Sequence, residues 1–442
     1  MTGAVSSRVD RLSGTVRVPG DKSISHRALM LGALAVGETR ITGLLEGADV
    51  LATGAALAAM GVDLAPAGGG VWRVGGVGVG GLRPPDDVLE MGNSGTSARL
   101  LLGLLATHPV DAVLTGDESL RRRPMSRVID PLTAMGARVD ARDGGLLPLR
   151  IRGAELPLPI DHTPPVPSAQ VKSAILLAAL NTPGRSVVRE SVATRDHTER
   201  MLAAMGADIA IETPPEGGRI ISLTGEAELK PQAIDVPGDI SSAAFPIVAG
   251  LIRPGSTVTV TDVGVNPLRT GLLTALEQMG AQVERRNDRL AGGEPVADLT
   301  ATAPNGLTGV DLDPALVPLM IDEFPVLFVA AAFADGVSRF RGIGELRVKE
   351  SDRLAVMARA LEASGVRVEE SDDGLVIHGT GRPPEGGARH ATHLDHRIAM
   401  ALLVLGMGTQ APTAIDDATP IGTSFPDFLT MMRDLGAAIE ST

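Results

Sequence analysis

The pattern of apolar and polar residues repeats six times along the chain. In each repeat, a helical segment ends at Met-Gly or a close variant, and a short alternating segment typical of a β-strand follows. Glycine adopts the left-handed conformation at a helix C-terminus with little steric strain, which accounts for its recurrence there. Successive copies are about 70 to 85 residues apart, so the pattern predicts six α/β units. The repeated glycines are Gly61, Gly136, Gly206, Gly280, Gly365 and Gly436.

A second pattern alternates with the first. A Ser, Asn or Asp precedes about twelve mostly apolar residues, and a Gly or Pro then ends the segment. Because these segments are apolar on nearly every side, they predict buried helices. The stretches between the two kinds of helix are β-rich, as in STVTVTDV at residues 256–263. The expected N-caps of the buried helices are Ser25, Asn93, Ser168, Asp239, Asp322 and Asp395.

Two similar turns divide the six repeats into two sets of three. VPGDKS occupies residues 18–23 and VPGDIS occupies residues 236–241, and Pro-Gly-Asp is typical of a turn. We therefore predict one domain at 21–235 with repeats 1–3, and a second domain with repeats 4–6 formed by 1–20 and 236–442, with hinges at the two turns. A chain of 442 residues is also too long for one ordinary core.

Composition narrows the class of protein. Hydrophobic residues make up 44% of the chain, as in globular proteins with a sizeable core. The net charge of −13 disfavours nonspecific binding to nucleic acid. No apolar run predicts a membrane span, and the charged N-terminal segment does not resemble a signal peptide. Without cysteine the chain has no disulfide, thiolate metal site or thiol nucleophile. We expect a cytoplasmic protein.

Several helix starts carry residues suited to anionic ligands. PGDKSISHR places Lys22, Ser23 and Arg27 at the first buried helix, and MGNSGTSAR places Asn93 and Gly95 at the second. Backbone N–H groups at a helix start, together with cations, favour phosphate or carboxylate. Each motif taken singly is also typical of an ordinary capped helix.

Further cations follow in the next repeats. ESLRRRPM contains three adjacent arginines, which cannot all face one site, so we expect one functional member. PSAQVKS places Ser168 and Gln170 at the third helix start, and TRDHTER supplies Arg195. A solvated surface is the ordinary alternative for each charged run.

Two acids stand out among the cations of the second half. Asp322 lies in IDEFP, and Glu350 lies in ELRVKESDR between Lys349 and Arg353. A site that only bound anions would gain from lacking carboxylates, so these acids indicate proton transfer or stabilisation of transient positive charge. LDHR adds His396 and Arg397. The cluster HATHLDH superficially resembles a metal site, but Asp395 is better explained as a helix cap, and no HExxH motif accompanies it.

These motifs together resemble one family. PGDKSxSHR, GNSGT, RRPM, SAQVKSA, RDHTE, VPGDxSSAAF, IDEFP, RVKESDR, DHRIAM and TSFPDF, in this order, are similar to the EPSP synthase family of enolpyruvyl transferases over nearly the whole chain. The resemblance implies an α/β fold of two similar domains, each of three βαβαββ units, with the active site in the cleft between them.

The resemblance also implies a reaction. The enolpyruvyl group of phosphoenolpyruvate is transferred to the 5-hydroxyl of shikimate 3-phosphate by addition and elimination of phosphate, on the route to chorismate and aromatic amino acids. No metal or organic cofactor is implied. We expect a monomer with these two small-molecule partners and no nucleic acid or membrane partner.

The family's motifs assign roles residue by residue. Lys22, Asp322 and Glu350 correspond to catalytic positions, with Asp322 as base for the 5-hydroxyl and Glu350 as proton donor to the methylene carbon. The positions for shikimate 3-phosphate correspond to Lys22, Ser23, Arg27, Ser168, Ala169, Gln170, Arg195, Asp322 and Lys349. The positions for phosphoenolpyruvate correspond to Lys22, Asn93, Gly95, Arg123, Gln170, Arg353 and Arg397.

The chain departs from the family pattern at two positions. Thr423 stands where many members have lysine, and Leu100 stands where many have proline. Gly95 stands where a branch that tolerates glyphosate often has alanine, so the response to this herbicide stays open. Two alternatives also stay open. UDP-N-acetylglucosamine enolpyruvyl transferase shares the fold but usually carries an active-site cysteine. A noncatalytic sugar-phosphate sensor is disfavoured by the paired acids.

Overall fold

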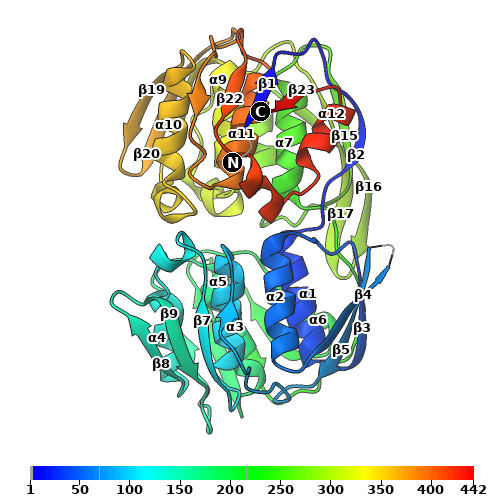
Figure 1. Ribbon diagram of the computed structural model, residues 1–442, viewed down its shortest axis with the longest axis vertical. Coiled ribbons are helices and arrows are strands. Elements are labelled where there is room, and N and C mark those ends of the chain that lie inside the picture. Colours follow the sequence, from blue (N-terminus) through cyan, green and yellow to red (C-terminus); the bar gives the residue numbers. More distant parts are fainter. Residues whose placement is uncertain (1–2, 69, 216) are drawn as a thin grey trace. The chain divides into compact units, whose positions relative to one another are not determined.

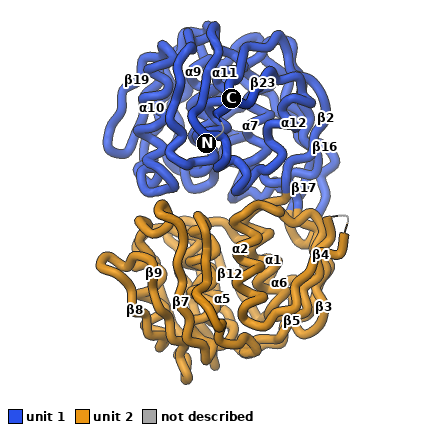
Figure 2. Tube along the Cα trace, viewed as in Figure 1, with its two compact units in different colours: residues 1–19, 237–290, 295–442 blue, residues 20–236, 291–294 orange. Residues whose placement is uncertain are grey.

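The computed structural model describes residues 3–68, 70–215 and 217–442. The chain forms two compact units, which are coloured separately in Figure 2. Unit 1 comprises Met1–Pro19, Pro237–Leu290 and Pro295–Thr442, and unit 2 comprises Gly20–Val236 and Ala291–Glu294. Each unit has its own hydrophobic core. Within the described residues, no helix is both long and apolar enough to cross a membrane.

A short segment lies in a different unit from the one that the sequence predicted. We expected residues 291–294 in the domain formed by 236–442, but they belong to unit 2. Two contacts explain the difference. Arg200 donates from Nη1 to the backbone oxygen of Gly293 at 3.2 Å, and His197 Nδ1 lies 2.8 Å from Glu294 Oε1. The chain therefore passes between the units four times, and the hinges at 18–23 and 236–241 remain a prediction.

Unit 2 contains repeats 1–3, and several of their helices and strands are labelled in Figure 1. Repeat 1 consists of β14 (Ala233–Asp235), α1 (Lys22–Leu34), β3 (Val36–Thr42), α2 (Ala48–Ala59), β4 (Asp63–Gly68) and β5 (Val71–Val77). Repeat 2 consists of β6 (Leu89–Glu90), α3 (Gly95–Leu105), β7 (Asp111–Thr115), the 3₁₀ helix η1 (Leu120–Arg122), α4 (Ser126–Ala134), β8 (Arg138–Arg142) and β9 (Leu146–Arg152). Repeat 3 consists of β10 (Asp161–His162), α5 (Ala169–Leu180), β11 (Arg185–Glu190), α6 (His197–Ala204), β12 (Asp208–Glu212) and β13 (Arg219–Thr224).

Unit 1 contains repeats 4–6. Repeat 4 consists of β2 (Ser13–Arg17), α7 (Ile240–Leu251), β15 (Thr257–Gly264), α8 (Gly271–Gln278), β16 (Gln282–Ala291) and β17 (Glu294–Thr302). Repeat 5 consists of η2 (Pro314–Leu319), α9 (Phe324–Phe333), β18 (Asp335–Phe340), η3 (Gly344–Val348), α10 (Arg353–Ala363), β19 (Arg367–Ser371) and β20 (Gly374–Thr380). Repeat 6 consists of β21 (Arg389–His390), α11 (His396–Gly406), β22 (Thr413–Ile415), η4 (Thr419–Thr423), α12 (Phe428–Asp434), β23 (Ala438–Ser441) and β1 (Ala4–Ser7).

Each repeat builds its own small sheet with nearly the same topology. In repeat 2 the strand order is β6-β7-β9-β8, with a parallel first pair and antiparallel pairs after it. Repeats 1 and 3 follow the same plan. Repeat 5 has three strands, and isolated parallel bridges such as Asp311 to Arg339 replace its fourth. The predicted α/β fold with three βαβαββ repeats in each of two units is confirmed.

Segments that are distant in sequence complete three of the sheets. Strand β14 pairs in parallel with β3 just before the chain leaves unit 2. Strand β2 pairs in parallel with β15, and β1 lies between β22 and β23 in the last sheet. These pairings tie both ends of each three-repeat set into the unit that contains it.

The two kinds of helix occur where the apolar pattern predicted them. The first helix of each repeat is almost wholly buried, and in unit 1 the helices α7, α9 and α11 pack against one another. In unit 2, α3 packs against α5 and α1. The second helix of each repeat ends at one of the repeated glycines, and all six have positive φ between 82° and 106°. The prediction of left-handed glycine at these helix ends is confirmed.

Candidate active site

The candidate residues gather at the N-terminal ends of helices. Three of the expected caps are confirmed, because their side chains accept a hydrogen bond from a backbone N–H of the first turn. They are Ser168 on α5, Asp239 on α7 and Asp395 on α11. The N-terminal dipole ends of these helices provide backbone donors and a positive potential for anions.

The other three expected caps are wrong by one to four residues. Their side chains make tertiary contacts instead of capping. Ser25 lies inside α1, where its Oγ accepts from the backbone N–H of Leu45 at 3.0 Å. Asn93 and Asp322 contact arginines, as described below. The actual N-caps of α1, α3 and α9 are Asp21, Ser94 and Glu323.

Lys22 is the first residue of α1, and its ammonium forms an ion pair with the carboxylate of Asp49 on α2. The Lys22 side chain is 15% exposed and that of Asp49 is 7% exposed, so the pair lies near the surface of unit 2 with its charge partly accessible. Sequence reasoning missed Asp49. It is 27 residues from Lys22, and no spacing rule relates a residue of α2 to one of α1.

Arg27 is buried one turn further along α1. Its guanidinium donates from Nε to Thr198 Oγ1 at 2.6 Å and from Nη2 to Ser173 Oγ at 2.7 Å. Nη1 donates to the backbone oxygen of Ser23 at 2.8 Å. These acceptors are neutral, and no carboxylate of the described residues forms an ion pair with Arg27. Burial lowers the pKa of Arg27 to about 10, so the buried cation would gain from an anionic ligand.

Asn93 connects the start of α3 to the arginine run. Arg123 donates from Nη2 to the side-chain oxygen of Asn93 and to Ser119 Oγ, the latter at 3.0 Å. Asn93 donates from Nδ2 to Asp117 Oδ2 at 2.6 Å. Of the three adjacent arginines only Arg123 is buried, while the other two are exposed. Burial therefore distinguishes Arg123 from its two neighbours, and a functional role for it stays a prediction.

Gly95 lies directly beside two arginines, Arg99 and Arg123. A Cβ atom at this position would lie 3.0 Å from Arg99 Nη1 and 3.3 Å from Arg123 Nη1. Arg99 also donates from Nη1 to Gln170 Oε1 at 2.8 Å, and Gln170 donates to Thr96 Oγ1 at 3.1 Å. The starts of α3 and α5 are thus joined by polar contacts, with a glycine where a side chain would crowd the cations.

The remaining unit 2 candidates are three residues of repeat 3 and Ser23 of repeat 1. Ser168 and Ala169 begin α5 and are partly exposed, as is Ser23 on α1. Arg195 is also partly exposed, in the segment between β11 and α6.

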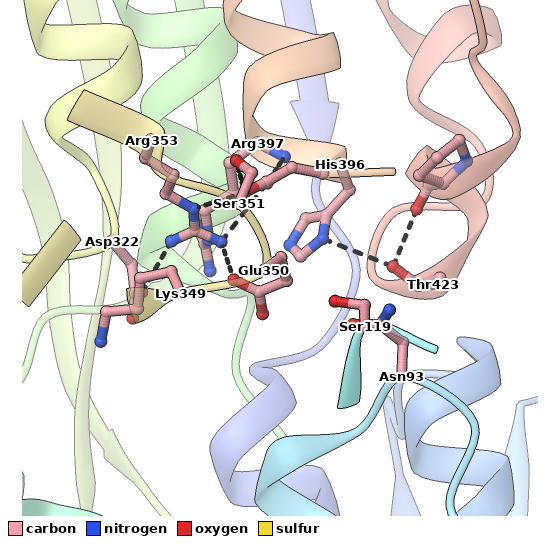
Figure 3. A network of polar contacts seen from close by, with 12 residues as sticks. Asn93, Ser119, Asp322, Lys349, Glu350, Ser351, Arg353, His396, Arg397 and Thr423 are labelled. Carbon is pink, nitrogen blue, oxygen red and sulfur yellow. Dashed lines mark hydrogen bonds and ion pairs between the residues drawn. The ribbon is translucent and has the colours of Figure 1, made fainter. Parts of the chain in front are cut away.

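Arg353 is the centre of the candidate residues in unit 1 (Figure 3). It is the first residue of α10, and its side chain is 1% exposed. Nη1 donates to Asp322 Oδ1 at 3.3 Å, Nε donates to Asp395 Oδ2 at 2.8 Å, and Nη2 contacts the Glu350 carboxylate. One buried cation thus holds three carboxylates. Burial opposes the charge on Arg353, but the carboxylates outweigh it and raise the pKa of the guanidinium.

This arrangement brings together the two acids singled out in the sequence. Asp322 and Glu350 belong to different helix starts, and both contact Arg353. Their side chains are 17% and 19% exposed, whereas that of Asp395 is fully buried. The alternative that VKESDR is a solvated helix start is wrong for Arg353. Asp395 was expected only as a cap, and its second role with Arg353 was missed.

The last candidates flank this cluster. Lys349 Nζ lies 3.5 Å from Glu345 Oε1. Arg397 lies in the first turn of α11, where its backbone N–H donates to the Asp395 cap. Thr423 Oγ1 donates to the backbone oxygen of Pro420 at 2.8 Å and lies 3.5 Å from His396 Nδ1. The hydroxyl at the family's usual lysine position therefore makes local contacts.

No group of three or more His, Asp or Glu side chains suited to a metal ion occurs in residues 3–68, 70–215 and 217–442. In HATHLDH, Asp395 serves the helix cap and Arg353, and His390 is buried in β21. Burial lowers the pKa of His390.

Comparison with known proteins supports one assignment. A sequence model of EPSP synthase (3-phosphoshikimate 1-carboxyvinyltransferase) matches residues 7–432. The chain is 57% identical over 426 residues to a 3-phosphoshikimate 1-carboxyvinyltransferase from Cereibacter sphaeroides, covering 96% of this chain and 95% of the relative. A relative of the same name from Parvibaculum lavamentivorans is 58% identical over 427 residues, covering 97% and 94%.

Solved structures agree. An EPSP synthase from Acinetobacter baumannii matches with a TM-score of 0.88 and 43% identity over 100% of both chains. The enolpyruvyl transferase NikO from Streptomyces tendae, at 20% identity and a TM-score of 0.78 over 100% of this chain and 98% of that chain, shares the fold. The family model and the matches at 43% to 58% identity decide against the UDP-N-acetylglucosamine enolpyruvyl transferase alternative. The chain belongs to the EPSP synthase (3-phosphoshikimate 1-carboxyvinyltransferase) family.

Proposed function

We propose that this chain transfers the enolpyruvyl group of phosphoenolpyruvate to the 5-hydroxyl of shikimate 3-phosphate, releasing inorganic phosphate. Family membership and relatives at 57% and 58% identity support this activity. The observation that carries the site assignment is the contact of Asp322 and Glu350 with the buried Arg353. A protein that only sensed sugar phosphates would have no use for two partly exposed carboxylates among its anion-binding cations.

The candidate cations divide between the substrates as the family motifs suggest. We assign shikimate 3-phosphate to Lys22, Ser23, Arg27, Ser168, Ala169, Gln170, Arg195, Asp322 and Lys349. We assign phosphoenolpyruvate to Lys22, Asn93, Gly95, Arg123, Gln170, Arg353 and Arg397. Because candidates lie in both units, catalysis requires both.

In the addition step, Asp322 accepts the proton of the 5-hydroxyl. The 5-hydroxyl oxygen of shikimate 3-phosphate forms a bond to C2 of phosphoenolpyruvate at the same time. Glu350 donates a proton to the methylene carbon, which becomes a methyl group. The product is a tetrahedral intermediate that carries the phosphate. In the elimination step, the methyl carbon loses a proton to the Glu350 carboxylate. The C–O bond to phosphate breaks, the leaving phosphate takes up the proton held by Asp322, and the enol ether remains. Lys22, at the start of α1, is a further candidate for proton transfer.

Arg353 explains how Glu350 acts as an acid. Its guanidinium contacts the Glu350 carboxylate and favours the ionised form that remains after the proton has been donated. That carboxylate then stabilises positive charge developing on C2. The same contact disfavours the protonated form in the free enzyme, so the proton must be delivered when substrates are bound.

Replacing Glu350 with glutamine tests this role. Glu350→Gln keeps the size of the side chain and a hydrogen-bonding oxygen for Arg353 but cannot donate the proton. We expect kcat for phosphate release to fall by about two orders of magnitude or more, with substrate binding largely retained. Glu345→Gln, the same change next to Lys349, is the matched control and should keep near-normal turnover. Normal turnover in Glu350→Gln would remove Glu350 from the mechanism.

We also propose that the chain is a cytoplasmic monomer that binds neither nucleic acid nor membranes. The acidic net charge of −13 supports the absence of a nucleic-acid partner.

A further inference from the structure

A fully buried ion-pair cluster lies in unit 2, among residues to which the reaction above gives no role. Lys172 of α5 places its ammonium 2.8 Å from Glu190 Oε2 and 2.8 Å from Glu199 Oε1. The three side chains are at most 1% exposed. Burial raises the pKa of the Glu199 carboxyl, and the contact with Lys172 opposes this effect. A buried cluster of this kind is weak evidence for stability, because desolvation offsets much of the attraction.

The cluster holds the residue that precedes Arg195. Lys172 Nζ donates to the backbone oxygen of Thr194 at 3.2 Å, and Glu190 Oε2 accepts from the backbone N–H of Thr194 at 3.4 Å. Glu190 Oε1 also accepts from the Thr194 hydroxyl. Both backbone polar groups and the side chain of Thr194 are therefore fixed by the side chains of Lys172 and Glu190.

The neighbours of the cluster hold Arg27. Ser173 follows Lys172 on α5, and Thr198 precedes Glu199 on α6. Their hydroxyls lie 2.7 Å apart, and each accepts a hydrogen bond from the Arg27 guanidinium. Two neighbouring contacts thus join α5 to α6. One is the ion pair of Lys172 with Glu199, and the other is the hydroxyl pair of Ser173 and Thr198, which orients the buried Arg27.

We propose that Lys172 is a positioning residue for shikimate 3-phosphate, which fixes α5 against α6 and thereby sets the positions of Arg27 and of the segment that carries Arg195. The proposal rests on the proposed function, in which both arginines contact this substrate. Lys172 itself, fully buried, does not touch the substrate. Of the phosphoenolpyruvate candidates of unit 2, Lys22 and Gln170 are shared with shikimate 3-phosphate, whereas Asn93 and Arg123 hold each other through a contact outside the cluster.

Lys172→Met tests the proposal, because it removes the ammonium and retains a long side chain. We expect the KM for shikimate 3-phosphate, and its Kd by calorimetry, to rise by about tenfold or more, because displaced cations bind poorly. The KM for phosphoenolpyruvate, measured at saturating shikimate 3-phosphate, should change by less than about threefold. A role in stability alone would reduce the amount of folded enzyme without this split between the two substrates.

Two further variants distinguish a positioning role of Lys172 from a general loss of stability or a failure to fold. Leu149→Ala, a core change in β9 of repeat 2, lowers stability without touching the cluster and should leave both KM values unchanged. If Lys172→Met does not fold, the triple variant Lys172→Met/Glu190→Gln/Glu199→Gln removes the uncompensated charges and should still show the selective rise. Unchanged or parallel KM values in the variant that folds overturn the proposal. Wild-type protein without binding or turnover would instead refute the proposed function, and this inference with it.

Discussion

A substitution of Arg353 should show that a buried charge network contributes more to the free energy of unfolding than an ordinary surface ion pair does. Arg353→Met removes the only cation that Asp395 contacts among the described ion pairs, and it leaves three carboxylates facing the vacated space. The Asp395 side chain is 0% exposed, so water cannot replace the lost partner without rearrangement. Asp322 and Glu350, at 17% and 19% exposure, should be partly resolvated.

The expected loss follows from this burial. Removing one partner of a buried ion pair costs about 3 to 5 kcal/mol, because an uncompensated charge stays buried. An exposed pair contributes only about 0 to 1 kcal/mol. Arg341 is the matched control, since its pair with Asp311 has both side chains more than half exposed. We expect Arg353→Met to destabilise by about 3 kcal/mol or more at pH 8, and Arg341→Met by less than about 1 kcal/mol.

Urea denaturation, monitored by circular dichroism, measures both losses in the free energy of unfolding. The dependence of the Arg353→Met loss on pH is the more specific test. In the wild type, the raised pKa of Arg353 keeps its stabilising contribution constant between pH 5 and 8, because it is lost only at far higher pH. In Arg353→Met the crowded carboxylates should have raised pKa values, so their penalty is present at pH 8 and shrinks as they protonate toward pH 5. Arg353→Met/Asp395→Asn should recover part of the loss, because asparagine still caps α11. The reasoning is refuted if the deficit is no larger than that of Arg341→Met, or if it grows as the pH falls.

Two further predictions concern ligands. Gly95→Ala places a Cβ 3.0 Å from Arg99 Nη1 and 3.3 Å from Arg123 Nη1, so we expect a severalfold rise in the KM for phosphoenolpyruvate and weaker competitive inhibition by glyphosate, measured by steady-state kinetics. Gly54→Ala is the control, because its Cβ would lie no closer than 3.5 Å to its nearest neighbour, Leu64, and it should change neither value. An unchanged KM for phosphoenolpyruvate in Gly95→Ala would show that the two arginines shift without consequence. Shikimate 3-phosphate should also reduce the radius of gyration in small-angle scattering, because anions draw cationic helix starts of both units toward one ligand. An unchanged radius at saturating ligand would contradict the predicted hinges.

The sequence predicted most of the fold because the governing interactions are local. A glycine at a helix end needs positive φ whatever lies around it, so Gly61 and its five counterparts marked the repeats correctly. Apolar residues on every side of a segment require burial, and the first helix of each repeat is buried. The cap positions were less reliable, because the side chains of Asn93 and Asp322 are used in contacts with arginines from other segments.

The composition, the six repeats and the ordered motifs by themselves determined the fold class and the family, and they supplied the residues of the candidate site. Only the tertiary structure decided which residues are partners. Asp49 contacts Lys22, and Asp395 contacts Arg353 across 42 residues, because separate helices start close together in space. The same holds for the cluster around Lys172, whose two carboxylates come from β11 and α6. Burial then sets the strength of each charge, since a pair removed from water interacts strongly and an exposed one does not.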